Sequence, residues 1–400
     1  MKRLAALLIA CLLIASLGLQ APPASALGTP PDPATDPFYA APANLAELQP
    51  GTVIRKRKVS VNLVGGGGIG VPLVLATSYQ ILVRSNDAKD RPAAVAATVL
   101  VPVFGARRQL LAYQPATDSL GAQCEPSYTL QTGGEKEATF MALGLAKGLT
   151  VVVPDHQGPR HAYAAGRMAG HAVLDSIRGA LATPEAKLAG PGTKVGMIGY
   201  SGGAIATGWA AELHPTYAPE LNVAGAVSGG TPADLELAGS FMDGSAFSGL
   251  FLGASLGMMR EYPELGSILN EKGRAFAEQI KDECSGELAL HAFQSVKDYS
   301  DHPDPLRTQV AQTVLHENKM GVGSTAPRAP VLLWHSKFDE LIPHQAATEL
   351  HQRWCDRGAR VRLVTNYTSE HVIGALLMVP EALTWLLDRY DGKPLGATCR

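Results

Sequence analysis

The chain lacks an excess of basic side chains. Its 34 lysine and arginine residues stand against 36 acidic residues, and only 18% of all residues are charged. With this balance of charge, no basic patch argues for binding to nucleic acid or to an anionic membrane. The chain also has no Cys-x-x-Cys pair, which disfavours a zinc site. What remains is an ordinary globular composition, 46% hydrophobic over 400 residues, which can form a large core.

One apolar run stands out at the N-terminus, and it is short. Met1-Lys2-Arg3 precedes it, the run extends from Leu4 to Leu19, and Ala24-Ser25-Ala26 follows. This order predicts a secretory signal peptide over residues 1–26, cleaved after Ala26, and a secreted chain whose net charge moves from -2 to -4. A membrane anchor is disfavoured because the run is short and a cleavage site follows. Lipid attachment at Cys11 is a weaker alternative, because Cys11 comes very early in the apolar region.

Cysteine is scarce, and after removal of the signal peptide an even number remains. These are Cys124, Cys284, Cys355 and Cys399. In an exported chain they predict two disulfides, and three pairings are open because spacing alone does not choose among them.

One stretch has the glycine spacing of a dinucleotide-binding motif but not the helix that should follow it. The stretch Gly65–Gly70 has the glycine spacing, but Val71-Pro72-Leu73-Val74 follows it and not a helical pattern. We therefore expect a turn between strands at this place.

Strand and helix patterns alternate along most of the chain, after an extended N-terminal arm expected over Leu27 to Ala46. Strands are predicted over Val53 to Val64, Ser78 to Arg84, Ala93 to Val103, Gln109 to Gln114, Leu149 to Pro154, Lys194 to Ile198, Val223 to Val227, Pro330 to Trp334 and Arg360 to Val364. Helices are predicted over Glu135 to Lys147, Leu174 to Leu188, and Ala204 to Leu213. This alternation predicts an α/β fold with a mostly parallel central sheet flanked by helices.

About a hundred residues separate two of these strands, which is too long for a loop. Runs from Leu265 to Ile280 and from Gly286 to Val296 read as helices, so we predict a mainly helical cap over residues 233–326, inserted into a core of residues 27–232 and 327–400. A helical excursion on the far side of the sheet is the alternative. The apolar stretch Phe241 to Met259 is a candidate acyl-contacting or lid surface, although a buried cap core explains it equally well.

The most informative stretch is Gly199-Tyr200-Ser201-Gly202-Gly203, because an apolar strand pattern leads into it and a helical pattern leads out. Glycines flank a nucleophile at such a turn, where strand and helix meet too closely for side chains. Ser201 is therefore the candidate nucleophile, against the simpler interpretation of a serine in a glycine-rich turn. The backbone N–H of Gly202 is then a candidate donor to the oxyanion.

A serine hydroxyl needs a histidine base and a carboxylate to orient that base, and in α/β-hydrolases the order is serine, acid, histidine. Asp339 follows the strand Pro330 to Trp334 and is the candidate acid, with Glu340 as its rival. His371 follows the next strand and is the candidate base.

Three further histidines lie close to these positions in the sequence. His335 and His344 are close to Asp339 and are expected to line the site or to cap a helix. His156 follows a strand at the same sheet edge and is expected either to shape the pocket or to have a structural role.

These motifs together resemble the secretory lipase family of α/β-hydrolases, the group that includes the Candida antarctica lipase A type. The resemblance extends over nearly the whole mature chain and includes Asp36-Pro37-Phe38-Tyr39, Gln114 to Tyr128, Pro154-Asp155-His156-Gln157-Gly158 and Gly199 to Ala204. It implies an ester hydrolase without cofactor, with Ser201, Asp339 and His371 as the triad. It also implies Asp118 and Gly202 as oxyanion donors, and Cys124 paired with Cys284 and Cys355 with Cys399.

The sequence therefore predicts a secreted serine ester hydrolase, a triacylglycerol lipase or esterase whose partner is a lipid or other ester, at a lipid–water interface where the substrate is a lipid. No metal or protein partner is indicated. An acyltransferase would use the same residues, and a non-catalytic hydrolase-fold binding protein is the rival from another class. A peptidase is a third alternative, disfavoured because nothing resembles a charged pocket for a peptide terminus.

Overall fold

The computed structural model of the chain describes residues 30–63 and 71–399. The predicted signal peptide with Ala26 and Cys11 lies outside the described residues, and so does Gly65–Gly70. All elements named below belong to the unit Pro31–Arg400.

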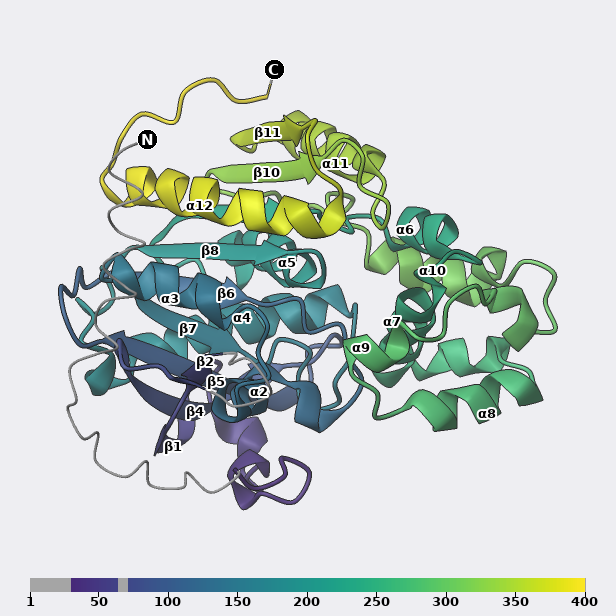
Figure 1. Ribbon diagram of the computed structural model, residues 1–400, viewed down its shortest axis with the longest axis horizontal. Coiled ribbons are helices and arrows are strands. Elements are labelled where there is room, and N and C mark those ends of the chain that lie inside the picture. Colours follow the sequence, from purple (N-terminus) through teal and green to yellow (C-terminus); the bar gives the residue numbers. More distant parts are fainter. Residues whose placement is uncertain (1–29, 64–70, 400) are drawn as a thin grey trace, which may run out of the picture. The chain divides into compact units, whose positions relative to one another are not determined.

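A nine-stranded sheet organises the described residues, in the order β1-β4-β5-β7-β6-β8-β9-β10-β11 (Figure 1). Its strands are β1 (Val53–Val59), β4 (Ala76–Asn86), β5 (Pro92–Pro102), β6 (Leu110–Gln114), β7 (Thr150–Pro154), β8 (Val195–Tyr200), β9 (Val223–Gly229), β10 (Val331–Ser336) and β11 (Val361–Asn366). Pairing is antiparallel from β1 to β7 and parallel from β7 to β11. The predicted α/β class with a mostly parallel sheet is therefore confirmed.

A separate antiparallel pair, β2 (Asn62–Leu63) and β3 (Val71–Pro72), flanks the glycine-rich stretch. The predicted strand Val53 to Val64 is thus divided between β1 and β2.

Helices cover both faces of the sheet because its strands are apolar on both sides. Val152 packs into the core on one face, whereas Val151 and Val153 pack into the core on the other. The helices that flank the sheet are α2 (Pro126–Thr132), α3 (Ala138–Ala146), α4 (Gly166–Leu181), α5 (Gly202–Tyr217), α11 (His344–Asp356) and α12 (His371–Tyr390). Helices α3 and α12 lie across one face, and α4, α5 and α11 pack on the other (Figure 1).

The predicted helix Leu174 to Leu188 was wrong at both ends. Helix α4 begins at Gly166, eight residues earlier, because Trp209 packs against the bare backbone of Gly166 and Gly170, and this contact stabilises the first turns. It ends at Leu181 because Pro184 follows and has no N–H to donate.

The N-terminal arm is not fully extended as predicted. It contains two 3-10 helices, η2 (Pro37–Tyr39) and η3 (Leu45–Glu47). Phe38 is buried against Leu82, Ala94 and Ala96 of the sheet, so the arm is anchored where it crosses the antiparallel strands.

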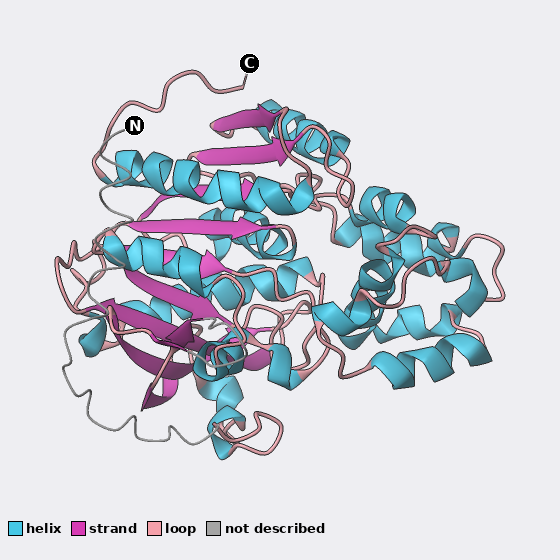
Figure 2. Cartoon of the chain, in the orientation of Figure 1, coloured by secondary structure: helices cyan, strands magenta, loops and turns pink. Residues whose placement is uncertain are grey.

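Between β9 and β10 the chain forms helices and loops without a strand (Figure 2). The helices are α6 (Leu235–Met242), α7 (Ser248–Glu261), α8 (Glu271–Ile280), α9 (Ser285–Leu288) and α10 (Gln309–Glu317). Figure 1 shows them beyond the ends toward which β8 and β10 point, at the carboxyl edge of the parallel strands. We call this segment, residues 230–330, the helical insertion. The remaining described 3-10 helices are η5 (Ala122–Cys124), η6 (Pro184–Ala186), η7 (Pro263–Ile268), η8 (Val296–Tyr299) and η9 (Pro305–Arg307).

Two predicted helices of the insertion differ from the structure. The run Leu265 to Ile280 is broken at Asn270, whose side chain caps α8 by accepting the N–H of Gly273 at 2.8 Å. The run Gly286 to Val296 is helical only in α9. Phe293 has a φ of 61°, and its N–H donates to the carbonyl of Ser245 at 2.8 Å, so the backbone bonds to a neighbouring loop in place of a helix.

A covalent seam joins the helical insertion to the core. Disulfides pair Cys124 with Cys284 and Cys355 with Cys399, the pairing that the resemblance implies. Beside the first of them, the N–H of Leu120 donates to the carbonyl of Glu283 at 2.9 Å. Residues 282–285 of the insertion are therefore fixed to the loop that follows β6.

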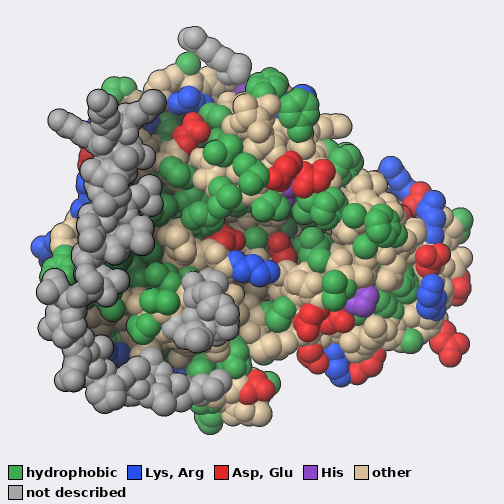
Figure 3. Space-filling view, in the orientation of Figure 1, with side chains coloured by type: hydrophobic (Ala, Val, Ile, Leu, Met, Phe, Trp, Pro, Cys, Tyr) green, Lys and Arg blue, Asp and Glu red, His purple; other side chains and the backbone are tan. Residues whose placement is uncertain are grey.

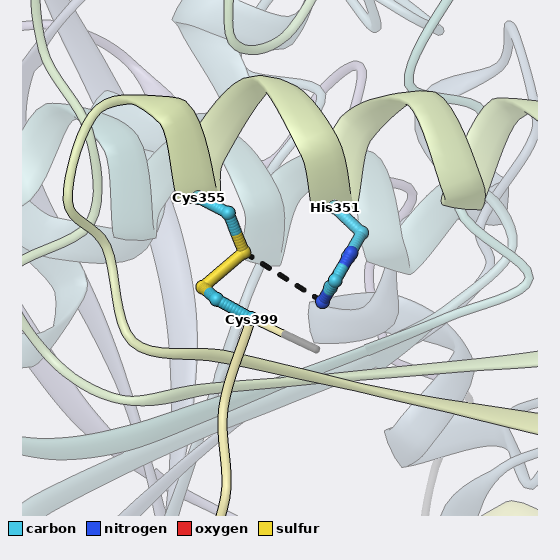
Figure 4. A group of neighbouring side chains, drawn as sticks. All are labelled: His351, Cys355 and Cys399. Carbon is cyan, nitrogen blue, oxygen red and sulfur yellow. Dashed lines mark hydrogen bonds between the residues drawn. A yellow bond between two sulfur atoms is a disulfide. The ribbon is translucent and has the colours of Figure 1, made fainter.

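The second disulfide lies beside a histidine of α11, and Figure 4 shows the three side chains together. His351 Nε2 is 3.6 Å from Cys355 Sγ. The sulfur atoms of Cys355 and Cys399 are bonded to each other, so neither is a thiolate. The group of His351, Cys355 and Cys399 therefore offers a metal ion only the imidazole of His351.

Helix α12 alone, among the residues searched, is long and apolar enough to cross a membrane by length and composition. Its Met378, Ala382 and Leu386 pack into the sheet core. It therefore belongs to the core of the fold. Its composition is so apolar because the exposed side of its first turns is apolar as well.

Candidate active site

Ser201 occupies the sharp turn between β8 and α5. Its φ of 55° and ψ of -123° are unusual for a residue with a side chain, and such strain is common at functional sites. A Cβ on Gly203 would lie 2.9 Å from the carbonyl carbon of Gln114, closer than real Cβ contacts. Gly203 is thus required by the approach of neighbouring backbone, whereas a side chain at Gly202 would meet the carboxyl of Asp118.

Three residues predicted from the sequence are connected in series. His371 Nε2 is 2.9 Å from Ser201 Oγ, and His371 Nδ1 is 2.7 Å from Asp339 Oδ2. Since a carboxylate only accepts, Nδ1 carries the proton and Nε2 is free to accept the hydroxyl proton of Ser201. The three side chains come from the turn after β8, the first residue of α12 and the loop after β10.

Asp339 is held in its ionised form. Its Oδ1 accepts the N–H groups of Leu341 at 3.0 Å and Ile342 at 2.7 Å. Burial acts to raise the pKa of Asp339, but the hydrogen bond and charge of His371, together with smaller contributions from His335 and Ile342, lower that pKa below its usual value. The ionised carboxylate can stabilise a cation on the imidazole.

Glu340, the rival acid, has a different contact. Its Oε2 accepts the backbone N–H of His371 at 3.0 Å and makes no hydrogen bond with the imidazole. Of the two neighbouring carboxylates, Asp339 therefore has the geometry of an orienting acid, and Glu340 fixes the backbone at the start of α12.

The other histidines have supporting contacts. His335 is fully buried, with Nε2 2.9 Å from the carbonyl of Ile342 and 3.4 Å from Asp339 Oδ2. His344 begins α11, and its Nε2 is 2.9 Å from Thr365 Oγ1. His335 thus packs beside the acid. His344 neither caps α11 through its side chain nor lines the cavity, so the expectation for His344 was wrong.

Asp118 lies against Gly202. A Cβ on Gly202 would lie 2.7 Å from Asp118 Cγ and closer still to Oδ1, an oxygen that is buried without a hydrogen-bond partner in the described structure. Burial raises the pKa of Asp118 to about 6, although the charges of His371 and Lys136 act to lower it. When protonated, the buried carboxyl of Asp118 beside the N–H of Gly202 can donate to a ligand oxygen atom.

The loop that carries Asp118 is held from several sides. His156 Nε2 is 2.8 Å from the carbonyl of Pro115, and burial lowers the pKa of His156 to about 4, so the ring is neutral at pH 7. The N–H of Ala116 donates to Glu137 Oε1 at 2.7 Å. His156 therefore has the structural role that was one of its two expected roles.

Sequence reasoning missed Glu137 and Tyr163. Tyr163 lines the same cavity as Asp118, Ser201 and Gly202, which places it beside the site. Its position after β7, at the carboxyl edge of a parallel strand, was the available signal. Glu137 lies at the start of α3 and is buried only through tertiary contacts, so no local pattern marked it.

A mostly apolar cavity of about 140 Å³ opens at Ser201. The core contributes Asp118, Tyr163, Ser201 and Gly202, whereas most other lining residues come from the helical insertion. They include Met242, Phe251, Met258, Met259, Leu265 and Ile268. Much of the stretch Phe241 to Met259 thus lines the cavity, although Phe241 itself is outside the lining and 47% exposed.

Comparison with known proteins agrees with this geometry. The sequence signature described as Secretory lipase matches residues 122–398 of the chain. The chain belongs to the secretory lipase family. Members of a lipase family are carboxylic ester hydrolases, and this secretory lipase is an enzyme of that class.

Individual relatives cover nearly the whole of this secretory lipase. Lipase 4 of Candida albicans is 33% identical over 402 residues, which cover 96% of this chain and 87% of that protein. Secreted triacylglycerol lipase LIP1 of Malassezia furfur is 34% identical and covers 91% of this chain and 77% of that protein. The extent of these matches shows that core and insertion both belong to the family pattern.

Solved structures share the fold. Candida antarctica lipase A in its closed state has a TM-score of 0.85 at 29% identity, covering 93% of this chain and 89% of that chain. The rice cell wall degrading esterase LipA of Xanthomonas oryzae has a TM-score of 0.67 at 19% identity, covering 87% of this chain and 100% of that chain. The first match places this secretory lipase among the α/β-hydrolases, and the second supports the fold alone.

Proposed function

We propose that this secretory lipase hydrolyses carboxylic esters through a covalent acyl-enzyme on Ser201. The observation that carries the proposal is the hydrogen-bonded series from Ser201 through His371 to Asp339 at a strained strand–helix turn. His371 accepts the hydroxyl proton as Ser201 Oγ attacks the ester carbonyl carbon, and Asp339 stabilises the resulting imidazolium.

The tetrahedral intermediate then needs donors for its oxyanion. Gly202 supplies its backbone N–H at the start of α5, and the protonated carboxyl of Asp118 supplies the second donor from the opposite loop. The protonated imidazole of His371 gives its proton to the departing alcohol as the ester C–O bond breaks. Water, deprotonated by His371, then attacks the acyl-enzyme and releases the carboxylic acid and Ser201.

The substrate we propose is a triacylglycerol or another ester with an extended acyl chain. The apolar lining of the cavity supports this class, because an acyl chain gains free energy when it leaves water for such a surface. The name of the Malassezia furfur relative, a secreted triacylglycerol lipase, points the same way.

The domain organisation is part of the proposal. Residues 1–26 are a signal peptide, residues 27–232 and 327–400 form the hydrolase core, and residues 233–326 form a cap that supplies most of the acyl-contacting wall. N-terminal sequencing of the exported protein should give a chain that begins at Leu27. A chain that retains residues 1–26 would contradict the cleavage site.

The central test measures initial rates on p-nitrophenyl esters from short to long chains and on emulsified triacylglycerol. Turnover of long chains and emulsion that is lost in Ser201→Ala supports a lipase, whereas turnover of short soluble esters alone indicates an esterase with a narrow pocket. Asp339→Asn should lose turnover and Glu340→Gln should keep it. The reverse result would reassign the acid.

Two alternatives have distinct outcomes in the same experiments. An acyltransferase would give a new ester in place of free acid when an alcohol is added, so product analysis separates it from a hydrolase. A binding protein would leave Ser201 unlabelled after treatment with a fluorophosphonate.

A further inference from the structure

An unusually apolar surface lies beside the candidate catalytic histidine. It is formed by the first turns of α12 and by the loops after β10 and β11, and we call it the α12 face. Its exposed side chains are Phe338 (65%), Tyr367 (65%), Val372 (64%), Leu376 (51%), Leu377 (45%) and Ile373 (44%). The two loops are tied together, because the N–H of Lys337 donates to the carbonyl of Asn366 at 2.6 Å. Figure 3 shows hydrophobic side chains gathered over α12.

The exposure of this face is not explained by the fold. The opposite side of α12 already packs into the sheet core through Met378, Val379 and Ala382. No Asp, Glu, Lys or Arg occurs between Glu370 and Glu381, so after His371 the first half of the helix is apolar all round. A surface helix is ordinarily polar on its outer side, and a contiguous exposed apolar patch marks a contact surface.

The position of the face connects it with the site. His371 is the first residue of α12, and Val372 follows it on the exposed side. The loop that carries Phe338 continues into Leu341 and Ile342, which line the cavity at Ser201. Whatever docks on the α12 face is therefore held next to the cavity that would take an acyl chain.

Charge selects the kind of partner. The acidic side chains of Glu340, Glu370 and Glu381 adjoin the face, and Lys337 is the basic side chain beside it. The whole chain also carries a net charge of -2. A surface of this sign does not attract anionic phospholipid, whereas apolar side chains insert into a neutral lipid surface without a charge partner.

We propose that the α12 face is the surface by which this protein docks on uncharged lipid, such as a triacylglycerol droplet or a bilayer with zwitterionic headgroups. The inference rests on the proposed function, because docking at this place serves to present lipid esters to Ser201. The side chains that insert are those of α12 and the two adjoining loops, and the acidic neighbours remain in the aqueous phase.

The test separates docking from turnover. In the Ser201→Ala background, the variant Val372→Gln/Leu376→Gln/Leu377→Gln is compared with its parent by co-flotation with phosphatidylcholine vesicles and with a triolein emulsion. We expect the ratio of lipid-bound to free protein to be at least tenfold lower for the triple variant than for its parent. A matched control, Val74→Gln/Phe104→Gln, removes two side chains that are 78% and 81% exposed; Phe104 leads into the amino end of β6, at the opposite sheet edge. The control should bind like the parent.

Turnover by the chain with Ser201 intact gives the second readout. The triple variant should hydrolyse a soluble p-nitrophenyl ester at the parental rate and lose about tenfold on emulsion, with circular dichroism and Tm to verify folding. Flotation remains informative even where no ester is turned over, so failure of the proposed function is distinguishable from failure of this inference.

Four results would overturn the inference. The first three are flotation of the triple variant that equals the parent's, a loss of flotation in the control that equals the triple variant's, and binding that requires an anionic lipid. The fourth is a dimer in sedimentation that only the triple variant abolishes, without any change in lipid binding. The last result would assign the α12 face to a second copy of the chain.

Discussion

Gly202→Ala tests the contact between Asp118 and the residue after Ser201. The added methyl group would lie 2.7 Å from Asp118 Cγ and 3.1 Å from Oδ2, and it would overlap Oδ1. Such distances are not sustained in folded proteins, so the carboxyl of Asp118 must rotate away or the turn must shift. Alanine is otherwise well tolerated here, because Gly202 is the first residue of α5 and has an ordinary helical conformation.

The size of the effect follows from the role proposed for Asp118. Displacing one oxyanion donor costs about 100- to 1000-fold in kcat, or about 3 to 4 kcal/mol of transition-state stabilisation. Global stability should change much less, because the overlap involves one side chain at the edge of a cavity. The assay is kcat on a soluble p-nitrophenyl ester below pH 6, where Asp118 carries its proton, together with the Tm of each variant.

A double-mutant cycle gives the decisive comparison. In Asp118→Ala the colliding carboxyl is absent, so adding Gly202→Ala should cost little more, and the two losses should be coupled by about 3 kcal/mol. Gly266→Ala is the matched control, because a Cβ there meets nothing within 4 Å. Additive losses in the cycle, or parental kcat in Gly202→Ala, would refute the reasoning.

Three further predictions concern the same region. Because burial raises the pKa of Asp118 to about 6, its carboxyl can donate a hydrogen bond to the oxyanion only below that pH. The ratio of kcat/KM of the parent to that of Asp118→Asn should therefore fall as pH rises through 6, and a constant ratio would count against this donor. Burial also raises the pKa of Glu137 to about 8, so Glu137→Gln should have the parent's free energy of unfolding at pH 7. Glu137→Ala leaves the N–H of Ala116 without its acceptor and should lower that free energy by about 1 to 3 kcal/mol, as measured in urea. Replacing Cys124 and Cys284 by serine opens a bridge between residues 160 apart in sequence and should lower the free energy of unfolding by up to about 5 kcal/mol, and an unchanged denaturation midpoint would contradict this.

The sheet and the residues at its carboxyl edge could be predicted because both depend on local sequence. Strands buried on both faces, such as β7, read as continuous apolar runs. Ser201 and Asp339 each follow such a run within a few residues, and His371 follows the partly buried strand β11, so their order along the chain already indicated that they meet.

The helical insertion and the surroundings of the site could not be predicted to the same depth. Helix α4 begins at glycines that ordinarily disfavour helices, and only the packing of Trp209 against them explains the start. Glu137 and Tyr163 reach the site through contacts between elements far apart in sequence. The unusual φ of Phe293 likewise depends on a neighbouring loop, which no pattern within residues 286–296 encodes.

The covalent seam has a consequence for how the chain is made. Ribosomes add about 5 to 20 residues per second, so Cys124 waits about 8 to 32 seconds for Cys284, 160 positions later. No other cysteine occurs between them, and Cys355 and Cys399 are synthesised only afterwards. In a chain that loses the predicted signal peptide and enters an oxidising compartment as it is synthesised, Cys284 would meet Cys124 before any other cysteine, and Cys399 would meet Cys355. The order of synthesis would then favour the correct bridges with little reshuffling by an isomerase.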